Sequence, residues 1–252
     1  GGRGGGGGGG GAAAPAPPPP PAALIVEPLV QCAAGMAMHD ASYVSGLRAL
    51  CDRYQVHLIA DEIAVGCGRT GTFFACEQAG VWPDFLCLSK GISGGYLPLS
   101  LVLSRDAIYQ AFYDDDTARG FLHSHSYTGN PLACRAALAT LDLFDSDDVL
   151  AANARKSARL REALAPLAER DEVRHLRQRG TILAFDVALD AEQARGFSRR
   201  FFEQALRHEL LLRPIGTSVY LMPPYVLDDG EIDWLAAQTR ATLDATLAEV
   251  RA

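Results

Sequence analysis

Two charged residues at the ends of apolar segments, Asp61 and Lys90, have side chains that could do chemistry together. Asp61 lies near the end of the segment 57–62, Lys90 follows the segment 85–89, and both segments are typical of buried strands. Lysine is rare here, because only two of the 23 basic residues are lysines. In an open parallel α/β sheet, ligands bind at the carboxyl ends of the strands. We therefore expect Asp61 and Lys90 to line one crevice.

The two residue types suit a particular chemistry. A lysine in a dry position at a strand end has its ammonium form destabilised, so it becomes a nucleophilic amine suited to Schiff-base chemistry. An aspartate in the same crevice would keep a pyridine nitrogen protonated, which makes pyridoxal phosphate (PLP) an electron sink. Taken alone, a residue such as Asp61 or Lys90 is more often part of a buried ion pair or an ordinary charge at a strand end. The other lysine, Lys156, lies in a segment typical of the solvated face of a helix.

The pattern along the chain predicts an α/β fold in which a parallel sheet is covered by helices on both faces. The expected strands are 23–27, 57–62, 85–89, 100–104, 181–189 and 219–224, and the expected helices are 40–55, 129–144, 148–169, 191–209 and 228–250. The last third is typical of a smaller α+β domain joined to the first by two helices.

Three regions follow from this pattern. Residues 1–22 are Gly, Ala and Pro of low complexity, so we expect them to be disordered and interpret them as the mark of a truncated or misassembled reading frame. Residues 23–145 are the expected large domain, and residues 146–252 are the expected connecting helices and small domain.

The composition excludes some classes of binding partner and indicates a cellular location. A net charge of −7 with no basic stripe argues against nucleic acid or an anionic membrane as the main partner. No apolar run reaches the roughly 18 to 20 residues that a membrane span needs, so we expect a cytoplasmic protein. The six cysteines form no C-x-x-C pair and no zinc-like spacing, which favours reduced thiols and no metal.

The segment "ADEIAVGCGRTGTFFACEQAGVWPDFLCLSKGISGGYLPLS" resembles the cofactor region of class III aminotransferases, which are PLP enzymes of fold type I. The resemblance rests on D-E-x-x-x-G-x-G-R-T-G, then P-D, then the K-G-I-S-G-G block. It implies that Lys90 holds the cofactor covalently and later moves a proton between substrate and cofactor. It also implies that Asp61 binds the pyridinium nitrogen. The large-domain sheet of that fold would be incomplete here.

A second segment, "HSHSYTGNPLACRAA", resembles the part of the family that reaches across a dimer to the cofactor phosphate of the partner. The resemblance implies that Ser126 contacts the phosphate with His125 beside it, and that Ser124 lies near the substrate. The H-S-H pattern by itself also suggests a metal site. No Asp, Glu or Cys stands at a useful spacing, so we expect no metal.

A third segment, "LLRPIGTSVYLMPPYVL", resembles the branch of the family that acts in biotin synthesis, as does "VEPLVQCAAGM". In that branch, S-adenosylmethionine gives its amino group to 8-amino-7-oxononanoate. The resemblance implies that Arg213 pairs with the substrate carboxylate, for which a bidentate guanidinium is suited, and that Tyr220 and Arg69 line the same site. Cys32 departs from the branch, which usually has glycine there.

The resemblance runs from about residue 23 to the C-terminus and covers only part of the family fold. The family's Gly-Ser phosphate loop and its aromatic residue that stacks on the pyridine ring have no counterpart in this sequence. Three hypotheses therefore stay open: the biotin-branch transamination in a homodimer with shared sites, another class III ω-aminotransferase of the ornithine, acetylornithine or 4-aminobutyrate type, and a catalytically silent fragment.

Overall fold

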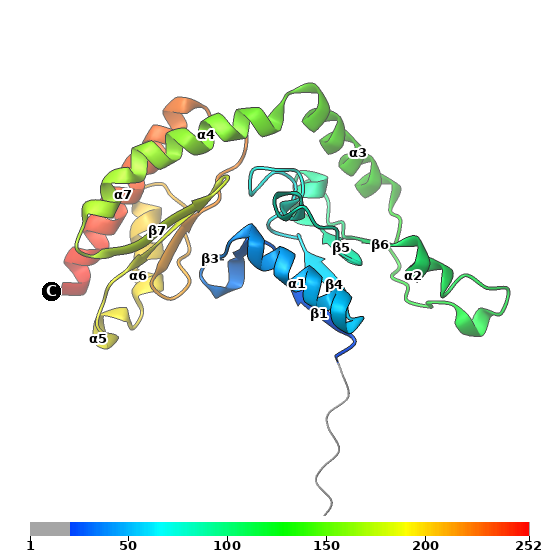
Figure 1. The fold of residues 1–252 in the computed structure, drawn as a ribbon. Helices are drawn as coiled ribbons and strands as arrows, with labels where there is room; N and C mark the ends of the chain where they lie inside the picture. Colours follow the sequence, from blue (N-terminus) through cyan, green and yellow to red (C-terminus); the bar gives the residue numbers. More distant parts are fainter. Residues whose placement is uncertain (1–20, 252) are drawn as a thin grey trace, which may run out of the picture.

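A computed structural model describes residues 21–251, so the expected disorder of residues 1–22 lies almost wholly outside the described part. The two larger sheets stand side by side, and two long helices, α3 (Pro131–Ser146) and α4 (Val149–Leu164), run as an arch across them (Figure 1). The expected order of a parallel-rich sheet followed by a smaller α+β unit is present. No helix in the described range is both long and apolar enough to cross a membrane.

The first sheet has the strand order β1-β4-β5-β6, and its first three strands are parallel as expected. Its strands are β1 (Ala23–Val26), β4 (His57–Asp61), β5 (Phe85–Leu88) and β6 (Leu101–Ser104), and helix α1 (Ala41–Tyr54) connects β1 to β4. The expectation that 100–104 joins a parallel sheet is wrong, because β6 pairs with β5 in the antiparallel sense. The short link between them holds only the 3-10 helix η3 (Lys90–Ser93), and a parallel pair needs a longer crossover.

One face of this sheet is covered and the other is open. Leu58 and Leu86 are buried on the covered face, which packs near the 3-10 helix η2 (Ala75–Ala79). On the opposite face, Ile25 and Val102 are 64% and 65% exposed. The expectation that helices cover both faces is therefore wrong for the described residues.

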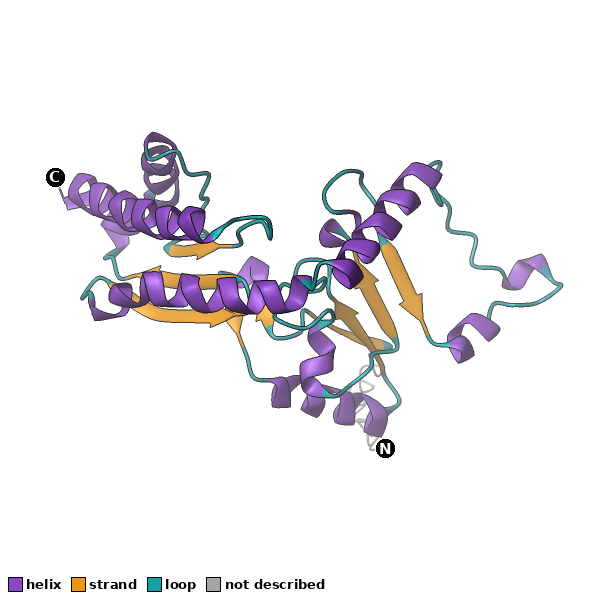
Figure 2. Cartoon of the chain, turned by 90° about the horizontal axis from the view of Figure 1, so that it is seen from above, coloured by secondary structure: helices purple, strands orange, loops and turns teal. Residues whose placement is uncertain are grey.

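The second sheet is antiparallel, in the order β7-β8-β9. It comprises β7 (Val173–Arg179), β8 (Ile182–Val187) and β9 (Ser218–Leu221). One face carries Phe185 and Leu221 into a core formed with α4, α6 (Phe197–Arg207) and α7 (Asp229–Arg251). The other face packs on the segment around Leu29 and Met36. Figure 2 shows the sheet between its helices and the rest of the chain.

Two expected helices are interrupted. The segment 191–209 forms α5 (Ala191–Ala194) and α6, with Gly196 at φ +77° between them. Glycine accepts this left-handed conformation without the steric cost of a Cβ. The segment 148–169 leaves the α-helix after Leu164 and continues as the 3-10 helix η5 (Ala165–Glu169), which contains a proline that has no N–H to donate.

Two further segments matter for the site. The hairpin of β2 (Val30–Gln31) and β3 (Ala37–Met38) encloses the 3-10 helix η1 (Cys32–Ala34), and we call residues 32–38 the turn. Residues 105–129, with α2 (Asp106–Gln110) and η4 (Thr117–Arg119), project away from both sheets in Figures 1 and 2, and we call them the arm.

Asp84 fixes the base of the first sheet. Its carboxylate accepts the N–H of Leu58 at 2.8 Å, pairs with Arg48 of α1 at 2.8 Å, and lies 3.3 Å from the guanidinium of Arg105. Burial by itself raises the pKa of Asp84, but the Leu58 N–H and Arg48 outweigh it and hold the pKa below its usual value. The ionised carboxylate thus ties α1, β4, β5 and the end of β6 together.

We expect Asp84→Asn to lower the free energy of unfolding by about 2 kcal/mol at pH 7, since it weakens buried charge-assisted hydrogen bonds. Because the folded pKa of Asp84 is depressed, the difference from wild type is complete above about pH 4 and shrinks as pH falls through the folded value. Urea unfolding from pH 3 to pH 7 measures it. The control is Asp142→Asn, whose pair with Arg135 is 70% exposed on both sides; an equal loss in both variants would contradict the prediction.

Candidate active site

Asp61 and Lys90 leave the first sheet at the same edge. Asp61 ends β4 and is the pairing partner of Cys87 in β5, and Lys90 begins η3 just after β5. The N–H of Glu62 donates to the Cys87 carbonyl at 3.0 Å, which continues the pairing past the strand end. Lys90 has φ +47°, a left-handed conformation that non-glycine residues rarely adopt. The β4–β5 register therefore delivers both residues to one edge of the sheet.

Lys90 is not in the dry position that the sequence predicts. The residue is exposed, and within residues 21–251 its ammonium makes no hydrogen bond or ion pair. No ion pair joins it to Asp61, so the alternative of a buried Asp61–Lys90 pair is not observed.

Asp61 is half-buried, and its Oδ1 accepts the N–H of Ile63 at 3.1 Å. Its other carboxylate oxygen has no hydrogen-bonding partner among the described residues. A half-buried carboxylate with one unpartnered oxygen, at the same sheet edge as a lysine that makes no hydrogen bond or ion pair with a described residue, fits a protonated pyridine nitrogen and an aldehyde. The residues present therefore fit PLP.

Two residues at this edge were not predicted as site residues. The carboxylate of Glu27 accepts the N–H of Cys32 at 3.1 Å and holds the turn against the end of β1. Burial, and then the Glu27 charge, raise the pKa of Cys32 to about 12, and the charges of Lys90 and Asp61 also act on its thiol. Cys32 is thus a protonated thiol near Lys90 and Asp61. The departure from glycine at position 32 was the one sequence signal.

Glu62, next to Asp61, has a structural role. Its side chain is only 1% exposed, and it accepts the N–H groups of Ala75 at 2.6 Å and Cys76 at 2.9 Å. Burial raises the pKa of Glu62, although the two N–H groups oppose that shift. Glu62 therefore fixes the start of η2 under the strand end that carries Asp61.

Arg213 and Tyr220 line one groove of about 440 Å³ beside β9 and the start of α7. Arg213 is exposed and makes no hydrogen bond or ion pair with a described residue, so its guanidinium is available to a ligand. The remaining lining is mostly apolar and comprises Leu210, Leu211, Leu212, Leu221, Met222, Pro223, Pro224, Leu227, Glu231, Trp234 and Leu235. The groove thus combines an apolar wall with one unpaired cation.

Arg69 is already engaged within the protein. Its guanidinium donates to the Pro223 carbonyl at 2.6 Å and lies 4.5 Å from the centre of the Tyr225 ring. Its carbonyl accepts the N–H of Thr181 at 2.9 Å. In this structure Arg69 ties the loop after β4 to the end of β9.

Ser124, His125 and Ser126 lie on the arm and are exposed. The N–H of His125 donates to Thr128 Oγ1 at 3.1 Å, and no described contact links the three residues to Lys90 or Asp61. The arm ends where Asn130 caps α3. The structure therefore does not bring this segment to the Lys90 edge of its own chain.

The structure corrects the prediction that Lys156 lies on the solvated face of a helix. It is half-buried rather than solvated, and its ammonium donates to the Tyr225 carbonyl. The six cysteines are free thiols. Among the residues that the structure describes, no group of three or more His, Cys, Asp or Glu side chains is arranged to hold a metal ion.

Comparison with known proteins defines the class. The family model of the class III aminotransferases matches residues 17–243, so the chain belongs to the class III aminotransferase family. Among curated relatives, the adenosylmethionine-8-amino-7-oxononanoate aminotransferase of Helicobacter pylori is 46% identical over 225 residues, covering 87% of this chain and 51% of that protein. The protein of the same name from Nitratidesulfovibrio vulgaris is 43% identical over 231 residues, covering 88% of this chain and 42% of that protein.

Solved structures agree with this assignment. The enzyme of that same name from Methanocaldococcus jannaschii superposes with a TM-score of 0.83 at 33% identity, covering 88% of this chain and 53% of the other. An amine transaminase from an uncultivated Pseudomonas species, in its PLP-bound form, gives 0.82 at 37% identity, covering 89% and 52%. The fold is therefore that of PLP-dependent transaminases, and the chain spans about half the length of the curated relatives it matches.

We expect Glu62→Ala to lower the free energy of unfolding by about 3 kcal/mol, because two buried N–H groups lose their acceptor. Glu62→Gln keeps one acceptor oxygen and should lose about half as much. Urea unfolding followed by circular dichroism measures both. Glu77→Ala is the control, since Glu77 also accepts a backbone N–H, that of Phe74 at 2.7 Å, but at an exposed position; a Glu62→Ala loss no larger than the control would refute the role.

Proposed function

We propose that the protein is a PLP-dependent transaminase that transfers the amino group of S-adenosylmethionine to 8-amino-7-oxononanoate, giving 7,8-diaminononanoate in biotin biosynthesis. The observation that carries the proposal is the delivery of Asp61 and Lys90 to one sheet edge by the β4–β5 register. The printed names of the most similar curated relatives support the choice of donor and acceptor. The proposal places the reaction in the cytoplasm.

Bound PLP supplies an electron sink for the electrons released when a proton leaves the substrate carbon. Lys90 would hold the cofactor by its amine and carry the proton between substrate and cofactor, for which its side chain must be without other partners. Asp61 keeps the pyridine nitrogen protonated through its unpartnered carboxylate oxygen. Glu27 and the turn lie at the same edge of the sheet, at the end of β1.

The groove with Arg213 and Tyr220 fits the proposed acceptor substrate. 8-Amino-7-oxononanoate is a long aliphatic chain that ends in a carboxylate, so it needs an apolar wall and a cation at one end. Leu211, Met222 and Trp234 supply such a wall, and the unpaired Arg213 guanidinium supplies the cation. Arg69, which the resemblance places at the same substrate site, also holds the end of β9 through its contact with Pro223.

A homodimer with shared sites is part of the proposal. The arm exposes large apolar side chains beside the predicted phosphate-contacting residues, since Phe121 is 72% and Leu122 81% exposed. Apolar patches of this kind mark protein interfaces. In the dimer, the arm of one protomer brings Ser126 and His125 to the cofactor phosphate of the other, with Ser124 near the substrate. The N-terminus of α3, which follows the arm, favours an anion.

Borohydride reduction of the purified chain with PLP, followed by peptide mass mapping, tests the cofactor role. We expect the pyridoxyl mass on Lys90 and its loss in Lys90→Ala, because the ammonium of the other lysine, Lys156, is engaged by Tyr225. Lys156→Ala is the matched control and should keep the label on Lys90. No label on Lys90, or equal label on Lys156 that survives in Lys90→Ala, would favour the silent-fragment hypothesis.

Donor profiling separates the branches once Lys90 is labelled. Turnover with S-adenosylmethionine supports the biotin branch. Turnover with ornithine, acetylornithine or 4-aminobutyrate alone supports another ω-aminotransferase, an alternative that the amine transaminase among the structural neighbours keeps open.

We expect Phe121→Asp to weaken self-association by about two orders of magnitude, because it buries a charge in an apolar interface. Light scattering coupled to size-exclusion chromatography measures the mass over a range of concentrations. Val226→Asp is the control, since Val226 is 86% exposed but lies outside the arm. A monomeric wild type, or equal effects of the two variants, would contradict the shared-site dimer.

A further inference from the structure

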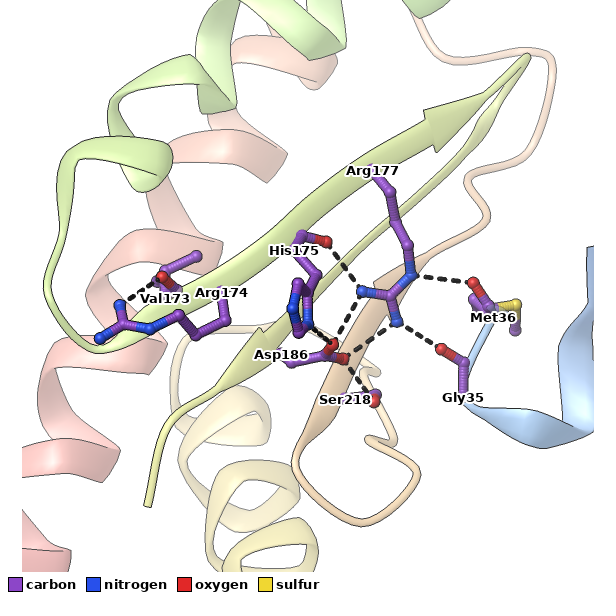
Figure 3. Close-up of polar contacts among 8 residues, drawn as sticks. All are labelled: Gly35, Met36, Val173, Arg174, His175, Arg177, Asp186 and Ser218. Carbon is purple, nitrogen blue, oxygen red and sulfur yellow. Dashed lines mark hydrogen bonds and ion pairs between the residues drawn. The ribbon is translucent and has the colours of Figure 1, made fainter. Parts of the chain in front are cut away.

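A polar network joins the second sheet to the turn (Figure 3). Its centre is Arg177 on β7, whose guanidinium donates from Nε to the Met36 carbonyl at 2.9 Å and from Nη2 to the Gly35 carbonyl at 2.6 Å. The same guanidinium pairs with both oxygens of Asp186 on β8, at 3.0 and 3.1 Å. Nη1 also donates to the carbonyl of His175 at 2.8 Å. All three nitrogens of the Arg177 guanidinium therefore donate hydrogen bonds, which fixes the orientation of the group.

Asp186 extends the network to the third strand. Ser218 on β9 donates its hydroxyl to Asp186 Oδ1 at 2.6 Å, and His175 Nδ1 lies 2.9 Å from Oδ2. Burial raises the pKa of Asp186, but Arg177 and Ser218 outweigh it and hold the pKa below its usual range. The carboxylate thus stays ionised, and one charge pair connects β7, β8 and β9 to the turn.

The turn approaches this sheet closely. Gly35 has φ +74°, and a Cβ placed on it would lie 2.9 Å from Ser218 Oγ. Beside this polar contact, Ile182 and Ala184 of β8 pack with Met36 and its neighbours in one apolar cluster. The turn therefore packs directly on the β7-β8-β9 sheet, through both polar and apolar contacts.

The two ends of this contact reach the two parts of the candidate site. On one side, the turn begins at Cys32, whose N–H donates to the carboxylate of Glu27 at 3.1 Å, directly after β1, which pairs in parallel with the strand that carries Asp61. On the other side, Tyr220 follows Ser218 by two residues on β9 and so lies on the same face of the sheet. The network is thus a polar link between the Lys90 edge and the strand that carries Tyr220, in addition to the contact of Arg69 with Pro223.

We propose that Arg177 is a positioning residue: by holding the turn on the β7-β8-β9 sheet, it sets the groove with Arg213 and Tyr220 at its working distance from Lys90. The inference rests on the proposed function, because it assigns the two parts of the site to the cofactor and to the acceptor carboxylate. Arg177 touches neither group. It acts through the turn on one side and through Asp186 and Ser218 on the other.

The first measurement is hydrogen–deuterium exchange of the full chain. Arg177→Gln should speed exchange of the Met36, Met38 and His39 amides by about tenfold, because the turn loses its anchor and opens locally. Arg174→Gln is the matched control, since the exposed Arg174 on the same strand donates only to the carbonyl of Val173 (Figure 3). Arg177→Lys, which keeps the charge without the fork, should give an intermediate rate and also serves if Arg177→Gln does not fold. Equal exchange in the Arg177 and Arg174 variants overturns the inference.

The second measurement separates positioning from plain stability. With PLP present, Arg177→Gln should raise the Kd for 8-amino-7-oxononanoate by about tenfold, because a small misplacement of one part of the site costs that much. Labelling of Lys90 by PLP and borohydride should stay within about twofold, since that edge is built by β4 and β5. An unchanged Kd overturns the positioning role. So does a joint loss of substrate binding and of Lys90 labelling, if both follow a lowered melting temperature of the variant.

The outcomes for the inference and for the proposed function are distinct. If wild type shows no Lys90 label or does not bind 8-amino-7-oxononanoate, the proposed function fails, and with it the assignment of the two parts of the site. The anchoring of the turn is then still decided by the exchange rates of the Arg177 and Arg174 variants.

Discussion

The parallel pairing of β4 with β5 is the constraint on which the candidate site depends. The register places Asp61 opposite Cys87, so the aspartate and the lysine three residues beyond Cys87 emerge at one edge. Asp84 secures that register from the opposite end, through the Leu58 N–H and Arg48. Glu62 secures it at the site end by holding η2. Two buried carboxylates with structural roles thus position one carboxylate that is free for a ligand.

The sequence predicts this edge because strand ends in parallel sheets carry ligands, and a rare lysine at such a place stands out. It does not predict β7, whose segment VRHLRQR lacks the alternation of a half-buried strand. The structure gives the reason: Arg177 faces a polar partner, Asp186, and backbone carbonyls of the turn, so its half-buried position carries a charge. Likewise, Arg69 and Lys156 pair with backbone carbonyls far along the chain, which no local pattern reveals.

Arginine has two different roles in this molecule, and the structure separates them. Arg69 and Arg177 both donate to carbonyl groups: Arg69 links the loop after β4 to the end of β9, and Arg177 links β7 to the turn. Arg213 has no partner among the described residues and opens onto an apolar groove. The Arg177 guanidinium donates to carbonyls of the turn and the Arg69 guanidinium donates to Pro223, whereas the Arg213 guanidinium, without a described partner, is available to a carboxylate. The resemblance alone assigned both Arg69 and Arg213 to the substrate.

The exposure of Lys90 bears on how such a site could become active. Desolvation makes a lysine nucleophilic, yet the ammonium of Lys90 meets solvent in the described chain. The open face of the first sheet, with Ile25 and Val102, and the apolar arm are further surfaces without cover. If the proposed function holds, the desolvation of Lys90 has to come from groups that settle on this edge, namely the cofactor and a second polypeptide surface. Association and catalysis would then be linked, so that Lys90 labelling should depend on protein concentration in the range where the chain assembles.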